Sequence, residues 1–292
     1  MLKFEHTKVM NWEAAIRGMR NPLESWDKSD SYVPECCGSC EVCSDIDCQN
    51  QPDIDGDIVI GPNDLGLMKG ESDSGYCYSR CESCDKEDCS LIYGEHSDSF
   101  YFGKNDLALA KRLRNAGTDH RKFMRQIIVS VDITAPLYWW KEFDTYKVGT
   151  VANSCSTMHC IHKKPFDVSD FAHDWLIGFG EPKDSFTIFE KGLYNPEDQT
   201  YWAASNLLMF TIRMLNFYRE RYLETKDKLF WYQMIQLLPE SYLQKRTITF
   251  NYEVLANIAR SRRDHKLDEW SVEFMDWMRS LPYAEDLIFE KG

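Results

Sequence analysis

The sequence predicts a mixed α/β fold that is interrupted by a cysteine-rich segment. Apolar residues occupy every second position from Ile127 to Ile133, which is the period of a half-buried strand. Amphipathic helical patterns precede and follow this strand, at residues 12–19 and 198–224. Residues 36–89 instead carry two copies of one cysteine pattern. We therefore expect strands and helices to share a core into which a metal-binding module is inserted.

The composition limits the partners that the chain can have. Its 292 residues are enough for one large core or two smaller ones. A formal net charge of −13 disfavours duplex nucleic acid and anionic membrane surfaces, because an acidic protein gains no counterion release there. No apolar run reaches the length of a membrane span, and residues 1–8 lack the apolar stretch of a signal peptide. We expect a cytoplasmic protein whose eleven cysteines are reduced or bind metal.

One helix is expected before the cysteine-rich segment and one after it. The first is a short amphipathic helix that Asn11 caps and that ends before Asn21. Its apolar face comprises Trp12, Ala15, Ile16 and Met19. The second covers residues 105–116, with Asn105 as its cap and Gly117 as its stop. The second helix leads into the central strand.

Eight cysteines form two copies of the pattern Cys-x3-Cys-x2-Cys-x4-Cys, 41 positions apart. The copies consist of Cys36, Cys40, Cys43 and Cys48, and of Cys77, Cys81, Cys84 and Cys89. Thiolates at this spacing can close on one metal ion, which would supply the folding energy that a small acidic segment lacks. Zinc is the first candidate for the metal, and an iron–sulfur cluster is the alternative.

The strand at residues 127–133 leads into a helix and then into a polar loop. The side chains expected to face the core are those of Ile127, Val129, Val131 and Ile133. Thr134 can cap the helix, and Pro136 lies just inside it, where a missing N–H costs nothing. The helix ends before Gly149, and residues 150–159 form the polar loop. Such a loop at the end of a rigid strand–helix unit is a common place for a ligand site.

Two further helices are expected in the C-terminal half of the chain. The first covers residues 198–224, and the second covers residues 229–238 and stops at Pro239. Residues at core spacing in the first helix are Trp202, Leu207, Phe210, Met214, Tyr218 and Tyr222. We expect this aromatic stripe to form part of the core.

His120 and Phe123 precede the central strand, and the strand ends in Ala135 and Pro136 before a helix. In this order of features the stretch resembles the flavin-dependent thymidylate synthases. That family has a strand ending in Ala-Pro, a helix, and the signature Arg-His-Arg-x-x-Ser-x-Asn-Glu-x-Ser-x-Arg. Ala135 and Pro136 match the strand end, and His120 and Phe123 match a His-x-x-Phe that precedes the strand. The glutamine before the signature is Glu142 here. With one inserted residue, the signature positions read Thr145, Tyr146, Lys147, Thr150, Asn153, Ser154, Ser156 and Met158.

A second stretch extends the resemblance. The family has Leu-Pro, a strand, and then Asn-x-Arg-x-x-x-Asn, with a catalytic arginine five residues beyond the second Asn. Here a Leu-Pro pair at residues 238–239 leads to Asn251, Asn257 and Arg262 at the same spacing without gaps. The family's arginine between the two asparagines is Glu253 in this chain, which is a reversal of charge.

The resemblance implies a fold, a cofactor and a reaction. The fold would be α/β (α+β), with a mainly antiparallel curved sheet flanked by helices, in a homotetramer. Residues 1–21 and 105–292 would form this domain, and residues 22–104 would form the inserted module. Reduced FAD would carry a one-carbon unit from methylenetetrahydrofolate to dUMP or a related pyrimidine deoxynucleotide, and NADPH would reduce the flavin.

The resemblance also assigns roles to residues by position. Arg262 would be catalytic and would orient the pyrimidine. The residues that would contact FAD are His120, Asn153, Asn251 and Asn257. The residues that would contact the substrate are Glu142, Lys147, Thr150 and Ser156.

The departures from the signature remove the arginines that hold the nucleotide phosphate in the family. Thr145 and Met158 occupy those positions, and a buried phosphate dianion without cationic partners is strongly unfavourable. The cations that could substitute are Lys147, Arg121, Arg125 and Lys163. The alternative is that the same scaffold serves as a non-catalytic, metal-stabilised module that binds nucleotides or proteins.

Overall fold

The structure is a computed structural model that describes residues 2–32, 100–177, 193–195 and 200–289. The two cysteine repeats, and with them the predicted zinc or iron–sulfur sites, lie outside these residues. The boundaries of the predicted inserted module therefore stay a prediction.

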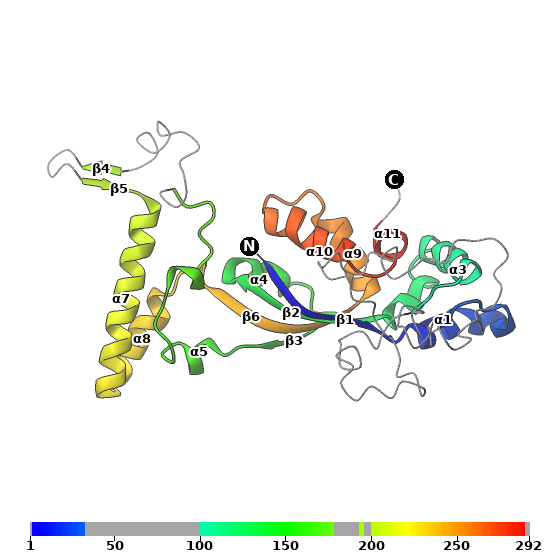
Figure 1. The fold of residues 1–292 in the computed structure, drawn as a ribbon, viewed down its shortest axis with the longest axis horizontal. Coiled ribbons are helices and arrows are strands. Elements are labelled where there is room, and N and C mark those ends of the chain that lie inside the picture. The colour runs from blue at the N-terminus through cyan, green and yellow to red at the C-terminus, as the bar shows by residue number, and fades with distance from the viewer. Residues whose placement is uncertain (1, 33–99, 178–192, 196–199, 290–292) are drawn as a thin grey trace, which may run out of the picture. The chain divides into compact units, whose positions relative to one another are not determined.

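A sheet of four strands runs through the structure, in the order β1-β2-β6-β3. Its strands are β1 (Lys3–Met10), β2 (Ile128–Pro136), β3 (Val151–Ser154) and β6 (Leu243–Asn251). Two short strands, β4 (Leu193–Asn195) and β5 (Thr200–Trp202), pair antiparallel in a separate small sheet. The neighbouring strands β2 and β6 come from the two stretches that carry the family resemblance (Figure 1).

The alternation predicted for the central strand is confirmed. Ile127, Val129, Val131 and Ile133 are all buried, and their chain neighbours in the strand are only half-buried. The strand continues to Pro136, so α4 (Leu137–Phe143) begins later than the sequence predicted. Thr134 therefore does not cap α4, because it still belongs to the strand, and Pro136 occupies the N-cap position without forming a side-chain cap. The predicted polar loop at residues 150–159 was also wrong in part, since β3 and the short helix α5 (Thr157–Cys160) form within it.

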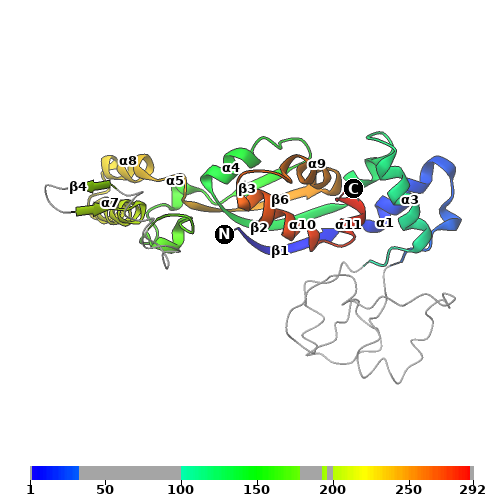
Figure 2. The ribbon, with the colours of Figure 1, turned by 90° about the horizontal axis from the view of Figure 1, so that it is seen from above.

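The chain divides into two compact units, which are described separately. One unit comprises Phe4–Asp132, Tyr146–Val151 and Ile248–Gly292. Its helices are α1 (Trp12–Arg20), α3 (Lys104–Asn115), α9 (Tyr252–Arg262), α10 (Met275–Arg279) and α11 (Ala284–Leu287). It also contains a π-helix (Glu269–Phe274) and the short 3₁₀ helices η1 (Asn21–Leu23), η2 (Trp26–Lys28) and η3 (Arg121–Arg125). Helices α9, α10 and α11 gather over one face of the strands in both views (Figures 1 and 2).

Aromatic side chains fill the core of this unit. The apolar face predicted for α1 is buried as expected, and Trp12 stacks on Phe100 with their ring centroids 5.6 Å apart. The Asn11 side chain does not cap α1 but donates to the Gln126 carbonyl at 2.8 Å. For α3, the cap position is Gly103 rather than Asn105, whereas the predicted stop at Gly117 is confirmed by its φ of +106°.

The other unit comprises Met1–Lys3, Ile133–Thr145 and Ala152–Thr247. It contains α4, α5, the 3₁₀ helix η4 (Val168–Asp170), α7 (Ala204–Thr225) and α8 (Lys228–Leu237). Helices α7 and α8 lie side by side (Figures 1 and 2), and their shared core includes Leu208, Ile212, Leu215 and Met234. The stripe predicted as core was wrong at two positions, because Leu207 and Phe210 are 64% and 54% exposed. None of the helices in the described ranges combines the length and the apolar composition of a membrane span.

Candidate functional site

Helix α9 carries three of the predicted site residues at its start, middle and end. Asn251 caps the helix, since its side-chain oxygen accepts a hydrogen bond from the Val254 N–H at 3.0 Å. Asn257 lies half-buried on the next turns, and its oxygen accepts from Arg260 at 3.3 Å. Arg262 is the last residue of the helix. The cap therefore gives Asn251 a structural role that the sequence did not reveal.

The guanidinium of Arg262 lies among aromatic rings. Its carbon is 4.9 Å from the ring centroid of the buried Trp270 and 5.4 Å from that of Tyr146. Its Nε donates to the Tyr146 hydroxyl at 2.8 Å, and the same hydroxyl is 2.9 Å from the Ser261 hydroxyl. Each cation–π contact contributes about 0.5–2 kcal/mol. These contacts hold the guanidinium plane in a defined orientation at the end of α9.

A tight turn brings the stretch around Tyr146 against the start of α9. Thr150 donates its hydroxyl to the Tyr146 carbonyl, which closes the turn. Gly149 has a φ of +78°, and a Cβ added there would lie 2.9 Å from Val254 and 3.1 Å from the Asn251 amide nitrogen. Only glycine permits both this backbone conformation and this close approach. Two predicted stretches, residues 146–150 and α9, are thus in direct contact.

The other predicted residues lie outside this contact. His120 and Lys147 belong to the same compact unit, and both side chains are exposed. Glu142, Asn153 and Ser156 belong to the second unit. Asn153 is exposed on β3, and the Ser156 hydroxyl caps α5 by accepting from the His159 N–H at 3.3 Å.

Glu253 has a structural role that the sequence did not suggest. This carboxylate is buried, and it accepts hydrogen bonds from Arg121 at 3.2 Å and from Arg125. The hydrogen bond to Glu253 raises the pKa of Arg125. Both arginines are among the cations that could replace the lost phosphate ligands, and Glu253 neutralises one of their two charges.

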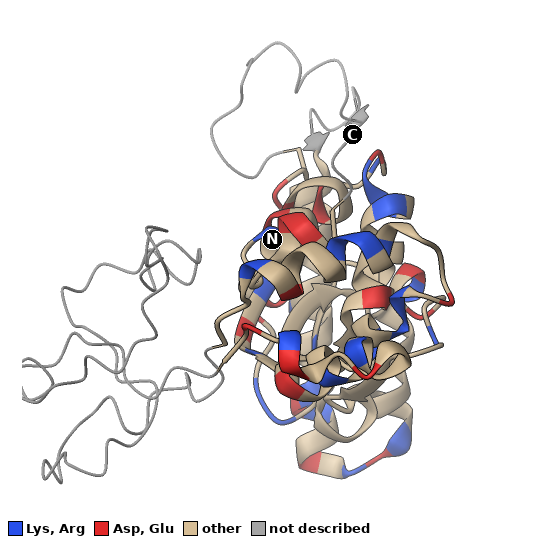
Figure 3. Cartoon of the chain, turned by 90° about the vertical axis from the view of Figure 1, so that its right-hand side faces the viewer, with Lys and Arg blue, Asp and Glu red and all other residues tan. Residues whose placement is uncertain are grey.

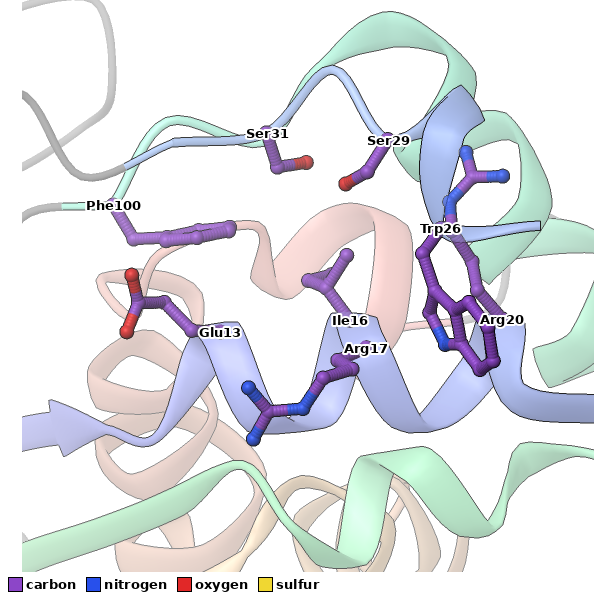
Figure 4. A pocket seen from close by; sticks show the side chains of 8 residues that line it. All are labelled: Glu13, Ile16, Arg17, Arg20, Trp26, Ser29, Ser31 and Phe100. Carbon is purple, nitrogen blue, oxygen red and sulfur yellow. The ribbon is translucent and has the colours of Figure 1, made fainter. Parts of the chain in front are cut away.

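A separate cavity of about 230 Å³ opens between α1 and residues 25–31 (Figure 4). It is lined by Glu13, Ile16, Arg17, Arg20, Trp26, Ser29, Ser31 and Phe100. None of the predicted site residues lines it, and its volume is below the usual range of about 300–1,000 Å³ for ligand pockets.

Beside this cavity, Arg20 donates to the fully buried Asp106 at 2.5 Å. Burial alone would raise the pKa of Asp106, but hydrogen bonds from Ser31, Ser29 and Arg20 outweigh it and lower the pKa.

Basic side chains and possible metal ligands are two further features of the described part of the chain. Lysine and arginine residues are interspersed with acidic residues on the side seen in Figure 3, so no broad basic band covers it. Within the described ranges, no group of three or more His, Cys, Asp or Glu residues is placed to hold a metal ion. The predicted metal ligands lie elsewhere in the chain, so this observation does not bear on them.

The comparisons with known proteins concern the fold. No protein-family model matches the chain, and no curated protein matches it. Thymidylate synthase X from Helicobacter pylori, solved with FAD and dUMP, is similar in structure with a TM-score of 0.51 and 12% sequence identity. This match covers 99% of the present chain and 98% of the other chain. A second structure of the flavin-dependent synthase from Helicobacter pylori, also with FAD and dUMP, gives a TM-score of 0.43 at 15% identity over 64% and 83% of the two chains. At such low identity, the first match establishes a mixed fold of helices and antiparallel sheet like that of thymidylate synthase X, and it establishes the fold alone.

Proposed function

We propose that the chain is a divergent flavin-dependent enzyme that transfers a one-carbon unit to a pyrimidine deoxynucleotide, dUMP or a relative. The observation that carries the proposal is the contact between Arg262 and Tyr146. It joins the two stretches of the resemblance, and it does so on a scaffold similar to thymidylate synthase X. A guanidinium fixed by aromatic rings is suited to polarise a carbonyl of a flat heterocycle.

The residues around Arg262 fit one edge of a flavin or pyrimidine ring. The amide nitrogens of Asn251 and Asn257 take part in no hydrogen bond with the residues that the structure describes, so both can donate to ring carbonyls. FAD, when bound, would supply the redox chemistry and take the one-carbon unit from methylenetetrahydrofolate, with NADPH as reductant. The chain itself would hold the rings, orient the pyrimidine through Arg262 and exclude water.

The phosphate of the substrate would have to be bound by residues other than the signature arginines that bind it in the family. Lys147 is exposed beside Tyr146 and is not engaged by a described carboxylate. Glu253 already pairs with Arg121 and Arg125, so these arginines offer one net positive charge between them. We therefore assign the phosphate contact to Lys147 first, as a point charge at the edge of the site.

FAD titration and tritium release from labelled dUMP test the proposal. We expect the purified full chain to bind FAD, with a visible flavin spectrum, and to release tritium only when methylenetetrahydrofolate and NADPH are present. FAD binding without tritium release from any pyrimidine deoxynucleotide would favour the non-catalytic nucleotide-binding alternative. Failure to bind FAD at all would overturn the proposal.

A further inference from the structure

The cavity beside α1 has a largely apolar wall. Ile16 and Phe100, which are 3% and 6% exposed, both line it. Figure 4 shows Phe100 and Trp26 at opposite ends of the cavity, with Ile16 between them. The Trp26 side chain is 49% exposed, and its indole N–H donates to the Asn21 side-chain oxygen at 2.9 Å, which holds the ring in place. A concave apolar surface with a fixed aromatic ring is suited to the apolar part of a small ligand.

Three polar residues of the lining are already engaged by one buried carboxylate. Ser29 and Ser31 donate their hydroxyls to Asp106 at 2.7 and 2.6 Å. Arg20 also donates to Asp106, and it donates to the Ser25 carbonyl at 3.2 Å. The positive charge of Arg20 is therefore balanced inside the protein, and Arg20 is not the group that would select a charged ligand.

The two remaining charged residues of the lining are Glu13 and Arg17. Both side chains are exposed, and the residues lie about 6 Å apart along α1, because they are four positions apart in the helix. A glutamate four positions before an arginine is the order that favours an ion pair within a helix. In the described part of the chain, however, neither side chain forms an ion pair, with the other or with a third residue. One negative and one positive group thus border the same cavity, and both can bind a ligand.

This pair of charges determines which ligands fit the cavity. A ligand that carries only a negative charge would be repelled by Glu13, and one that carries only a positive charge would be repelled by Arg17. A zwitterion satisfies both, since a guanidinium binds a carboxylate with two parallel hydrogen bonds and a carboxylate accepts hydrogen bonds from an ammonium group. The volume of about 230 Å³, which is below that of pockets for drug-sized ligands, limits the ligand to a small molecule.

We propose that this cavity binds a free α-amino acid with an apolar side chain. Arg17 binds the carboxylate of the amino acid, and Glu13 binds its ammonium group. The side chain of the amino acid packs against Ile16, Phe100 and the ring of Trp26. None of the residues assigned to the flavin or to the nucleotide lines the cavity, so the proposal does not depend on the proposed enzymatic function.

Isothermal titration calorimetry of the full chain with L-leucine tests the proposal. We expect saturable binding with a Kd below about 1 mM. Two analogues each lack one of the charges, since isocaproate has no ammonium group and isoamylamine has no carboxylate. Both should bind at least about tenfold more weakly than L-leucine, because each leaves one charge of the cavity unmatched. Absence of leucine binding, or an analogue that binds as tightly as leucine, would overturn the proposal.

Two substitutions show which side chain recognises which charge of the ligand. Glu13→Gln should weaken leucine binding at least about fivefold and remove the preference for leucine over isocaproate, whereas Arg17→Gln should weaken it similarly and remove the preference over isoamylamine. Lys28→Gln is the matched control, because Lys28 is exposed in η2 and does not line the cavity, and it should leave leucine binding unchanged. Circular dichroism of the three variants checks that they are folded. A folded Glu13→Gln or Arg17→Gln variant that keeps the wild-type preferences would contradict the assigned contacts.

Discussion

Arg262 shows how one residue can be recognised from sequence spacing while its surroundings cannot. The spacing from Asn251 and Asn257 singled it out. Its partners Tyr146 and Trp270 were not predicted, because no local pattern links residues 116 positions apart, as Tyr146 and Arg262 are. Long-range contacts of this kind are fixed by the fold, and periodicity and motifs are local.

Replacing Arg262 with lysine tests whether its planar guanidinium matters. Lysine keeps the charge, but it loses the Nε donor to Tyr146 and the flat stacking on Trp270. We expect kcat/KM for tritium release to fall by about 10²-fold or more, as for the loss of a preorganised donor. Arg263→Lys is the control, because Arg263 is exposed next to it and should keep full activity. Equal activity of both variants would contradict the assigned role.

Glu253 is expected to contribute to stability through its two arginine partners. Glu253→Gln leaves Arg121 and Arg125 without their carboxylate, and Arg121 is itself only 17% exposed. We expect the free energy of unfolding to fall by about 1–3 kcal/mol, less than for a fully buried pair because Arg125 is half exposed. Urea unfolding measures the change.

The matched control for Glu253 is Glu240, whose ion pair with Lys141 is exposed on both sides. Glu240→Gln should change the free energy of unfolding by less than about 1 kcal/mol. If Glu253→Gln changes the free energy of unfolding no more than this control does, the buried carboxylate does not contribute to stability as predicted.

At the scale of elements, the sequence predicted the buried face of strand β2 correctly but not that of helix α7. The strand β2 was predicted correctly because alternation of Ile127, Val129, Val131 and Ile133 has a single buried face. Helix α7 carries two apolar stripes, one with Leu208 and Ile212 and one with Leu207 and Phe210, and periodicity does not tell which stripe is buried. Strand β3 was missed because all four of its residues are exposed and give no alternation.

The turn at residues 146–150 depends on Gly149. Gly149→Ala introduces both a strained positive φ and a Cβ that lies 2.9 Å from Val254. We expect a loss of about 1–3 kcal/mol in the free energy of unfolding, together with weaker FAD binding because the turn is displaced from α9. The two effects are measured by urea unfolding and by FAD titration.

Gly117→Ala separates backbone strain from steric overlap. Gly117 also has a positive φ, +106°, but a Cβ added there would meet nothing within 4 Å. The free energy of unfolding of this variant should fall only by the cost of the strained φ, and the variant should bind FAD as the wild type does. If Gly149→Ala and Gly117→Ala lower the free energy of unfolding and FAD binding equally, the close approach to Val254 contributes to neither.

At the scale of the whole molecule, hydrogen bonds join the described residues that flank residues 33–99 on either side. The Asp106 carboxylate accepts hydrogen bonds from the Ser29 and Ser31 hydroxyls at 2.7 and 2.6 Å. The Asp30 carboxylate in turn accepts from the backbone of Asn105 at 2.7 Å. Beyond these residues, Tyr32 and Tyr101 form an antiparallel bridge. The described residues on the two sides of this segment therefore lie next to each other.

Replacing residues 33–99 with a short Gly/Ser linker should leave the rest of the fold intact, because the bridge already holds the ends adjacent. We expect the thermal midpoint to stay within a few degrees, as measured by circular dichroism. Metal analysis should find zinc or iron in the full chain and none in the shortened chain. A shortened chain that is unfolded, or that keeps the metal, would contradict the predicted inserted module.

The hydrogen bonds of Asp106 to Ser29 and Ser31 affect how costly it is to lengthen the segment between them. Once two ends are joined, the entropic cost of the segment between them rises only with the logarithm of its length, by about 0.6 kcal/mol for each doubling. Duplication of the cysteine unit, whose second copy lies 41 positions further along, would thus have lowered the free energy of unfolding of the surrounding fold only slightly. A duplication between these flanking residues is expected to destabilise the host fold little, whereas an insertion inside β2 or α9 would interrupt buried packing.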